Sequence, residues 1–314
     1  MRVVMFGYQT WGHKTLQALI ESRHEVVGVV THPTSDQAYE SIWADSVEDL
    51  ARGHDVPVHL ARRPDDALID RIHQWAPDII VANNWRTWLP PEIFDHPPHG
   101  TLNLHDSLLP KFTGFSPIAW ALISGAPEVG LTAHRMDGEL DTGDILTQAA
   151  VPIGPRSTAT ELVLATIDLI PEVLLESLDS IEAGTAGWRP QDLSERTFFH
   201  KRHETDSLID WSWDATDIDR LIRAMSDPYP NAFTHYRGER ISVVEAHVSQ
   251  GIYGGTPGRV FIREGDGMAI VAGPNAHRGT NRALVIDRVR TDDGTDHAAL
   301  EYFPSGGGYL TTTP

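Results

Sequence analysis

The chain has 314 residues, no cysteine, and 25 Lys and Arg residues against 44 Asp and Glu, which gives a formal net charge of -19. This length predicts about two domains, and 40% hydrophobic residues are typical of a globular protein. The absence of cysteine excludes disulfides, thiolate metal sites and cysteine nucleophiles. The acidic balance disfavours a nucleic-acid partner, because phosphate backbones are bound by clustered Lys and Arg.

The sequence carries no recognisable targeting or membrane segment. The apolar run at residues 1–7 is too short for a signal peptide, and no stretch approaches the roughly 18 apolar residues of a membrane span. We therefore expect a cytoplasmic protein with no membrane partner.

The first 155 residues alternate short apolar runs with amphipathic segments, which is typical of a parallel sheet with crossover helices. This pattern predicts strands at Arg2–Phe6, Val26–Val30, Val56–Leu60, Asp78–Ala82, Gly100–His105 and Gly130–Met136. It predicts helices at Thr15–Ser22, Asp65–Trp75 and Ser116–Ile123, a short helix capped by Ser46, and a last helix at Thr158–Ala183 that Pro171 breaks.

Beyond Gly184 the sequence becomes polar and rich in turns, which favours a linker at 186–206. One helix is then predicted at Ala215–Ser226, followed by short strands at Ala232–Tyr236, Ile241–Val248, Gly258–Ile262, Met268–Ala272 and Ala283–Arg290. We therefore predict an α/β domain at 1–185, whose open, mostly parallel sheet has helices on both faces, a linker at 186–206, and a small β-barrel at 207–314.

An amide and an imidazole stand two residues apart at the end of one predicted strand. Asn103 and His105 fall on the same side, because strand side chains alternate, and Leu102 and Leu104 face the opposite layer. Both polar groups donate hydrogen bonds to an oxyanion on a tetrahedral carbon, so the pair suits acyl transfer. Incidental polarity at a loop mouth is the alternative interpretation.

An acidic loop follows the next predicted strand. Its four acids are Asp137, Glu139, Asp141 and Asp144. One of these carboxylates can orient the imidazole or accept a proton from an attacking nitrogen, but their spacing does not choose among them. A solvated turn, in which Asp side chains cap their own backbone, is the alternative.

Two separated motifs resemble the 10-formyltetrahydrofolate-dependent formyltransferases. The first is Asn103-x-His105-x-Ser107-Leu108-Leu109-Pro110 with Gly114, and the second is Leu140-Asp141-Thr142-Gly143-Asp144. Asp210-Trp211 and Pro228 to Phe233 resemble the start of the family's C-terminal module. The resemblance implies a Rossmann-like catalytic domain, a barrel resembling an OB-fold, 10-formyltetrahydrofolate as co-substrate and no metal. It also implies a catalytic triad of Asn103, His105 and Asp141.

The same resemblance assigns binding residues to two groups. The folate is expected to be bordered by Arg86, Thr87, Trp88, Leu89, Met136, Asp137 and Leu140. Packing of the tryptophans beneath Pro90 is an alternative role for part of this stretch. The acceptor is expected to contact Tyr8, Gln9, Thr10, Asp106, Ser107 and Lys111. Asp106 either meets the substrate amine or caps a turn.

The acceptor distinguishes members of this family. Enzymes that act on methionyl-tRNA resemble one another in a basic insertion, but residues 34–51 contain no Lys or Arg and five acids, namely Asp36, Glu40, Asp45, Glu48 and Asp49. The stretches 6–13 and 83–91, together with Asp106, look most like the hydroxyornithine formyltransferases of siderophore biosynthesis. We therefore predict a small-molecule amine acceptor, N5-hydroxyornithine, and no nucleic-acid partner.

Three alternatives remain open. A nucleotide-linked amino sugar is indicated by Thr31-His32-Pro33, with Arg135, Arg156 or Lys111 as partners for the diphosphate. The other two are methionyl-tRNA as the acceptor and a folate-binding or regulatory relative without turnover. A homodimer is compatible with the sequence.

Overall fold

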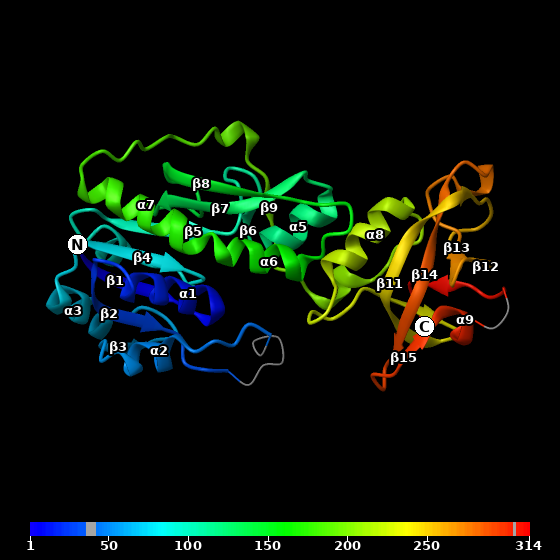
Figure 1. The fold of residues 1–314 in the computed structure, drawn as a ribbon, viewed down its shortest axis with the longest axis horizontal. Coiled ribbons are helices and arrows are strands. Elements are labelled where there is room, and N and C mark those ends of the chain that lie inside the picture. Colours follow the sequence, from blue (N-terminus) through cyan, green and yellow to red (C-terminus); the bar gives the residue numbers. More distant parts are fainter. Residues whose placement is uncertain (36–41, 304–305) are drawn as a thin grey trace. The chain divides into compact units, whose positions relative to one another are not determined.

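The computed structural model describes residues 1–35, 42–303 and 306–314 and divides into two compact units (Figure 1). The first unit comprises Met1–Ile118, Glu128–Pro152 and Leu162–His200. The second comprises Ala119–Pro127, Ile153–Glu161 and Lys201–Pro314. Asp36 and Glu40, which contribute to the acidic stretch considered above, lie outside the described residues.

The sheet of the first unit has the strand order β3-β2-β1-β4-β5-β7-β8 among the described residues. The pairings from β3 to β5 are parallel, whereas β7 pairs antiparallel with both β5 and β8. The strands are β1 (Arg2–Gly7), β2 (Glu25–Thr31), β3 (Val58–Leu60), β4 (Ile79–Asn83), β5 (Thr101–His105), β7 (Glu128–Arg135) and β8 (Ile145–Pro152). A mostly parallel sheet was predicted and is confirmed, but β8 was not predicted.

Helices cover both faces of this sheet, as predicted (Figure 1). They include α1 (Gln9–Ile20), α2 (Val47–Gly53), α3 (Asp66–Trp75), α4 (Pro91–Phe94) and α7 (Ile170–Glu182). Two further helices, α5 (Pro117–Ser124) and α6 (Ala159–Asp168), contain residues of both units. Phe6 and Ile80 pack with α3 and α4 in one buried cluster. On the other side, α1 packs against β1 and α7. No helix in the described ranges is long and apolar enough to cross a membrane.

Several helix boundaries follow the signals read from the sequence. The Ser46 hydroxyl accepts a hydrogen bond from the Asp49 amide at 3.0 Å, and the Asp65 carboxylate accepts one from the Leu68 amide at 2.9 Å. Each bond satisfies an amide that the first turn of a helix leaves without a partner. The predicted last helix is interrupted at Leu169, two residues before Pro171, and becomes α6 and α7.

The second unit contains a mainly antiparallel sheet with the order β12-β13-β14-β11-β10-β16 among its described residues. Its elements are β10 (Phe233–Tyr236), β11 (Glu239–Ile252), β12 (Val260–Glu264), β13 (Gly267–Ile270), β14 (Arg282–Thr291), β15 (Asp296–Ala298) and β16 (Leu310–Thr311), with the helices α8 (Ala215–Ala224) and α9 (Ala299–Tyr302). A bridge between Arg259 and Tyr309 joins the two ends of this order. The sheet therefore closes on itself, in agreement with the predicted barrel.

The strand order of the first unit changes direction at β1 and β4. From β1 the chain builds outward to β2 and β3, and from β4 it builds the other way to β5. In open α/β sheets, ligands bind in the crevice beyond the carboxyl ends of the strands at such a point. The turns after β1, β4 and β5 are therefore the expected position of a site.

Close packing of β2 against α3 leads to a stability prediction. A Cβ atom at Gly28 would lie 2.5 Å from ring carbons of the buried Trp75. Gly28→Ala should therefore lower the free energy of unfolding by about 1–3 kcal/mol in urea denaturation. Gly53→Ala is the matched control, because no atom lies within 4 Å of that position. Equal stability of the two variants would contradict this packing.

Candidate active site

The candidate site is built on the pairing of β5 with β7. The antiparallel register sets Asn103 opposite His134 and His105 opposite Thr132. Leu102 and Leu104 are buried, whereas Asn103 and His105 are partly exposed. The pleat therefore directs the amide and the imidazole to one side of the sheet, next to a second histidine that the sequence did not single out.

His134 fixes the orientation of the Asn103 amide. Its Nδ1 lies 2.9 Å from the Arg135 carbonyl, which can only accept, so Nδ1 carries the proton. Nε2 is then bare and accepts a hydrogen bond from Asn103 Nδ2 at 3.0 Å. Burial lowers the pKa of His134, an effect that Asp141 partly offsets, which keeps the ring neutral at pH 7. The amide nitrogen retains a second hydrogen for a ligand.

Asp141 lies between the two imidazoles. Its carboxylate is 3.9 Å from His105 Nδ1 and 3.9 Å from His134 Nε2, and the side chain is 8% exposed. The Gly114 amide donates to Asp141 Oδ2 at 3.1 Å. On its far side, His105 Nε2 donates to the Phe112 carbonyl at 3.2 Å. The three predicted catalytic residues therefore share one network with His134.

The other acids of the loop are used differently. Asp137 accepts hydrogen bonds from the Glu139 amide at 3.0 Å and from the Thr142 hydroxyl at 2.9 Å, so it closes the turn. Glu139 is exposed, and Asp144 is half-buried. Among the four acids, Asp141 is the one whose carboxylate faces both histidines.

The residues predicted to border the folate differ in their burial and in their hydrogen bonding. Leu89 is buried in the core cluster, and Met136 packs against that same cluster, so the two predicted segments meet there. Trp88 and Leu140 are exposed by 56% and 37%. The Thr87 hydroxyl is buried and has no hydrogen-bond partner among the described residues. The two segments thus offer both apolar surface and an unsatisfied polar atom.

A further cluster joins the ends of β1 and β4. Arg86 donates to the Gln9 side-chain oxygen at 2.6 Å, and its guanidinium lies 4.8 Å from the centre of the Tyr8 ring. The side-chain amide of Asn84 donates a hydrogen bond to the Tyr8 carbonyl at 3.1 Å. The structure therefore brings a residue predicted to contact folate against two predicted to contact the acceptor.

Asp106 follows His105 directly and is poorly satisfied. Its Oδ1 is buried without a hydrogen-bond partner, and so is the indole nitrogen of the nearby Trp11. Burial raises the pKa of the Asp106 carboxyl to about 6, although His105 and Trp11 oppose that shift. A cationic group placed against this carboxylate would recover part of the lost solvation.

The remaining predicted acceptor residues lie apart from these contacts. The Ser107 hydroxyl donates to the Lys111 carbonyl at 2.8 Å and closes the turn. The exposed Lys111 ammonium is 4.0 Å from Glu195. The Thr10 amide donates to the Trp43 carbonyl at 3.2 Å.

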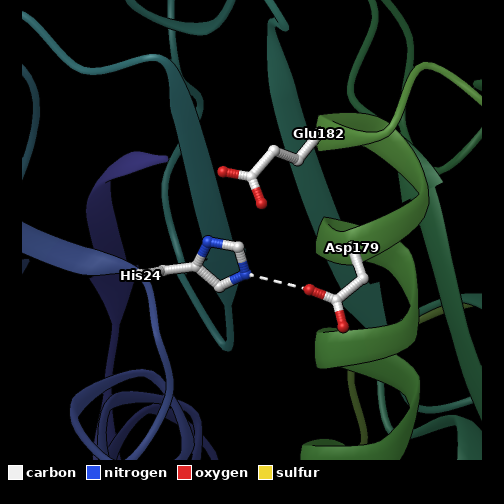
Figure 2. A group of neighbouring side chains, drawn as sticks. All are labelled: His24, Asp179 and Glu182. Carbon is white, nitrogen blue, oxygen red and sulfur yellow. Dashed lines mark ion pairs between the residues drawn. The ribbon is translucent and has the colours of Figure 1, made fainter.

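One group among the described residues has the spacing of metal ligands. The ligand atoms of His24, Asp179 and Glu182 lie within 4.8 Å of one another, and Figure 2 shows both carboxylates on α7, near the His24 ring. Arg23 lies 2.7 Å from Asp179 Oδ1 and 2.5 Å from Glu182 Oε2, and the N-terminal ammonium lies 3.0 Å from Glu182 Oε1. These cations already neutralise the carboxylates, so the group is an ion-pair cluster.

Comparison with known proteins finds one family domain in the N-terminal part of the chain and a second in the C-terminal part. Residues 1–178 match the family described as formyl transferase, and residues 202–305 match its C-terminal domain. The chain belongs to the formyl transferase family. The resemblance drawn from the motifs is thereby confirmed at the level of the family, and the reaction of this formyl transferase is the transfer of a formyl group.

The relatives of this formyl transferase differ in what they act on. Methionyl-tRNA formyltransferase of Desulfotalea psychrophila is 34% identical over 277 residues, which cover 88% of this chain and 85% of the relative. An N-formyltransferase from Helicobacter canadensis, solved with folinic acid and dTDP-3-aminofucose, has 16% identity and a TM-score of 0.66, covering 90% of this chain and 98% of that one. HypX from Aquifex aeolicus, solved with tetrahydrofolic acid, has 19% identity and a TM-score of 0.60. The match covers 96% of this chain and 47% of the HypX chain.

His134→Phe tests the network around Asn103. Phenylalanine keeps a planar ring but cannot accept the amide hydrogen bond, so the Asn103 amide loses its fixed orientation. We expect kcat for formyl transfer to fall by about 100-fold, the lower end of the range found when one oxyanion donor is lost, because the amide is misoriented and not removed. His73→Phe replaces an exposed histidine on α3 and is the control. Wild-type kcat in His134→Phe would contradict the network.

Proposed function

We propose that this formyl transferase uses 10-formyltetrahydrofolate to formylate the side-chain nitrogen of a small cationic amino acid, with N5-hydroxyornithine as the first candidate. The observation that carries the acceptor class is the Asp106 carboxylate beside His105, whose Oδ1 is buried without a hydrogen-bond partner among the described residues and whose pKa burial raises to about 6. The bond that forms joins the formyl carbon to the acceptor nitrogen, and the bond that breaks joins that carbon to N10 of the folate. The proton lost by the acceptor nitrogen balances the one that N10 takes up as tetrahydrofolate leaves.

The residues on the donor side fit a flat, amphipathic group such as the pterin of a folate. Trp88 and Leu140 provide exposed apolar surface on the two predicted segments. The buried hydroxyl of Thr87 and the buried indole N–H of Trp85 have no hydrogen-bond partner among the described residues. A pterin, with ring nitrogens and a carbonyl oxygen, offers acceptors for such donors. Folate ligands in the solved relatives support the same assignment.

Asn103 and His105 act on the oxygen of the formyl group. As the acceptor nitrogen bonds to the formyl carbon, negative charge develops on that oxygen, and preorganised donors stabilise it. Asn103 offers its second amide hydrogen, because the first is committed to His134. His105, on the same side of β5, acts on that oxygen through the positive charge of its protonated ring, since both of its N–H groups face Phe112 and Asp141.

Asp141 orients His105 and pairs with its protonated form. A neutral His105 that keeps its bond to the Phe112 carbonyl presents a bare Nδ1 to the carboxylate, whereas an imidazolium presents N–H groups to both acceptors. Asp141 therefore stabilises the protonated ring and helps to remove the proton of the acceptor nitrogen. Since a hydroxylamine nitrogen is a good nucleophile without prior deprotonation, this arrangement is sufficient for N5-hydroxyornithine.

The electrostatics near Asp106 favour a cationic acceptor over an anionic one. Ornithine derivatives keep an ammonium group at neutral pH, which can pair with a buried carboxylate. A nucleotide sugar brings a diphosphate, and a tRNA brings many phosphates, which require clustered cations. The net charge of -19 supports the same choice.

Methionyl-tRNA is the second candidate, because the relative that is 34% identical carries that name. A nucleotide-linked amino sugar is the third, because of the dTDP-3-aminofucose in the Helicobacter canadensis structure. The three acceptors differ in charge and size, so a direct comparison separates them.

The acceptor is tested by tetrahydrofolate release from 10-formyltetrahydrofolate. Parallel reactions contain N5-hydroxyornithine, ornithine, dTDP-3-aminofucose or methionyl-tRNA. We expect turnover with N5-hydroxyornithine, weaker turnover with ornithine, and none with the other two. Turnover with the amino sugar or the tRNA alone would overturn the proposed acceptor but leave the formyl transfer intact.

Asp106→Asn tests the role of the carboxylate. We expect KM for N5-hydroxyornithine to rise by about tenfold or more, the size of a lost charge-assisted contact, with KM for the folate unchanged. In the wild type, kcat/KM for the acceptor should fall as the pH drops through about 6, because the carboxyl becomes protonated. The variant should lack this dependence. An exposed acid on the same unit, Asp95, provides the control Asp95→Asn.

The same variant has a predictable effect on stability. The folded-state pKa of about 6 exceeds the ordinary value of 3.8, so the folded form becomes less stable as the pH rises between these two values. Asp106→Asn should therefore raise the free energy of unfolding at pH 7.5 by up to about 3 kcal/mol and change it little at pH 4. An unchanged acceptor KM together with unchanged stability would contradict both the contact of Asp106 with the acceptor and the raised pKa of its carboxyl.

A further inference from the structure

A short segment after α7 crosses both loops that surround His105. Residues 189–199, which we call the strap, pair with the first residue of β8 through Arg189, whose backbone exchanges two hydrogen bonds with Ile145 at 2.8 Å each. Farther on, Phe198 and Phe199 form β9, which pairs with Thr113 and Gly114 of β6. The predicted linker therefore begins as an ordered part of the first unit.

Gln191 is the strap residue that holds the Asp141 backbone. Its side-chain nitrogen donates to the Asp141 carbonyl at 3.0 Å and to the Gly143 carbonyl at 2.8 Å. Both partners only accept, so the amide orientation is fixed with its nitrogen toward the loop. Arg196 adds a hydrogen bond to the Leu140 carbonyl at 2.8 Å. The strap therefore donates hydrogen bonds to three carbonyls of the acidic loop, those of Leu140, Asp141 and Gly143.

The loop needs such support because its backbone is unusual. Asp141 has φ = 55°, a left-handed conformation that non-glycine residues adopt at some cost. At Gly143, a Cβ atom would lie 1.9 Å from the Arg135 carbonyl oxygen, so the turn cannot relax in that direction. The bonds from Gln191 fall on both sides of this turn.

The strap also holds the partner of His105 Nε2. The Phe112 amide donates to the Thr197 hydroxyl at 2.9 Å, and the Thr113 amide donates to the Thr197 carbonyl at 2.8 Å. The Phe112 carbonyl is the acceptor for His105. Both groups that face the nitrogens of His105 are therefore fixed by residues of the strap.

We propose that Gln191 is a positioning residue for formyl transfer, which acts by holding Asp141 in register with His105. The inference rests on the catalytic role proposed for Asp141. Gln191 itself touches neither reacting group; its amide sets where the carboxylate of Asp141 points. The strap thereby couples the two loops that orient His105.

Amide exchange at Gly114 tests the proposal without any substrate. The Gly114 amide donates to Asp141 Oδ2, whereas the neighbouring Thr113 and Phe115 amides donate to the strap backbone. In Gln191→Leu, NMR should show at least about tenfold faster exchange at Gly114, with Thr113 and Phe115 nearly unchanged. Equal acceleration at all three amides would indicate general loosening and overturn the proposal. Unchanged exchange at Gly114 would also overturn it.

Kinetics with 10-formyltetrahydrofolate and N5-hydroxyornithine supply the second measurement. Gln191→Leu should lower kcat about tenfold with both KM values unchanged, because a carboxylate displaced by a fraction of an ångström orients His105 poorly. In the Asp141→Asn background, Gln191→Leu should lower the residual kcat by less than about twofold. The effects of two substitutions on kcat do not add when both act through one carboxylate. Ser194→Ala, which removes a bond to Asp192 within the strap, is the matched control and should retain wild-type kcat.

The outcomes separate this inference from the proposed function. Wild-type activity of the Asp141→Asn variant would contradict the catalytic role proposed for Asp141, whatever the exchange rate at Gly114. A loss of activity in Asp141→Asn, with full additivity of Gln191→Leu in that background, would retain the role of Asp141 and overturn that of Gln191. Absence of turnover with N5-hydroxyornithine in the wild type would concern the acceptor, and the exchange at Gly114 would still decide the strap.

Discussion

The candidate site depends on one buried carboxylate held close to two imidazoles. Asp141 is 8% exposed and receives one hydrogen bond from a backbone amide, that of Gly114. A buried carboxylate is unfavourable unless polar groups surround it. Two imidazoles lie 3.9 Å from it, and protonation of His105 on Nδ1 would give the carboxylate a second N–H donor. The carboxylate thus faces His105 and also His134, the residue that orients the Asn103 amide.

Backbone conformation in the neighbouring turns indicates the same site. Gln9, Asn84, Phe112 and Asp141 all have positive φ angles between 53° and 57°. They follow β1, β4, β5 and β7, the strands whose connections surround the candidate site. Unfavourable backbone conformations persist where the surrounding structure holds them, and they concentrate at functional sites. The fold thus supplies rigid strands, and the strained turns carry the polar groups.

Much of the fold was predictable because its strands are buried on both faces. The continuous apolar runs of β1 and β4 identify them without reference to distant residues. The strand β8 was missed because it is half-exposed and contains no such run. Its neighbour β7 was predicted, but nothing local in the sequence indicated that the two strands turn antiparallel at that edge.

The site was predictable only in part, for a related reason. Alternation along one strand places Asn103 and His105 together, and family motifs selected Asp141 among four acids. His134 was missed because its role arises from the cross-strand register with Asn103, which local spacing does not encode. A signal was present: once β5 and β7 are taken as antiparallel neighbours, one register sets this histidine opposite the amide. Gln191 was missed because its partners are backbone carbonyls, which leave no mark in the sequence.

The most direct test of this network is the protonation state of His134, measured by NMR on protein with 15N-labelled histidines. Its signal is assigned as the one that disappears in His134→Phe. The network requires a neutral ring at pH 7 with its proton on Nδ1, and a titration midpoint below the ordinary value of 6.5. A charged ring at pH 7, or a proton on Nε2, would contradict it, because neither form can accept the hydrogen bond of Asn103.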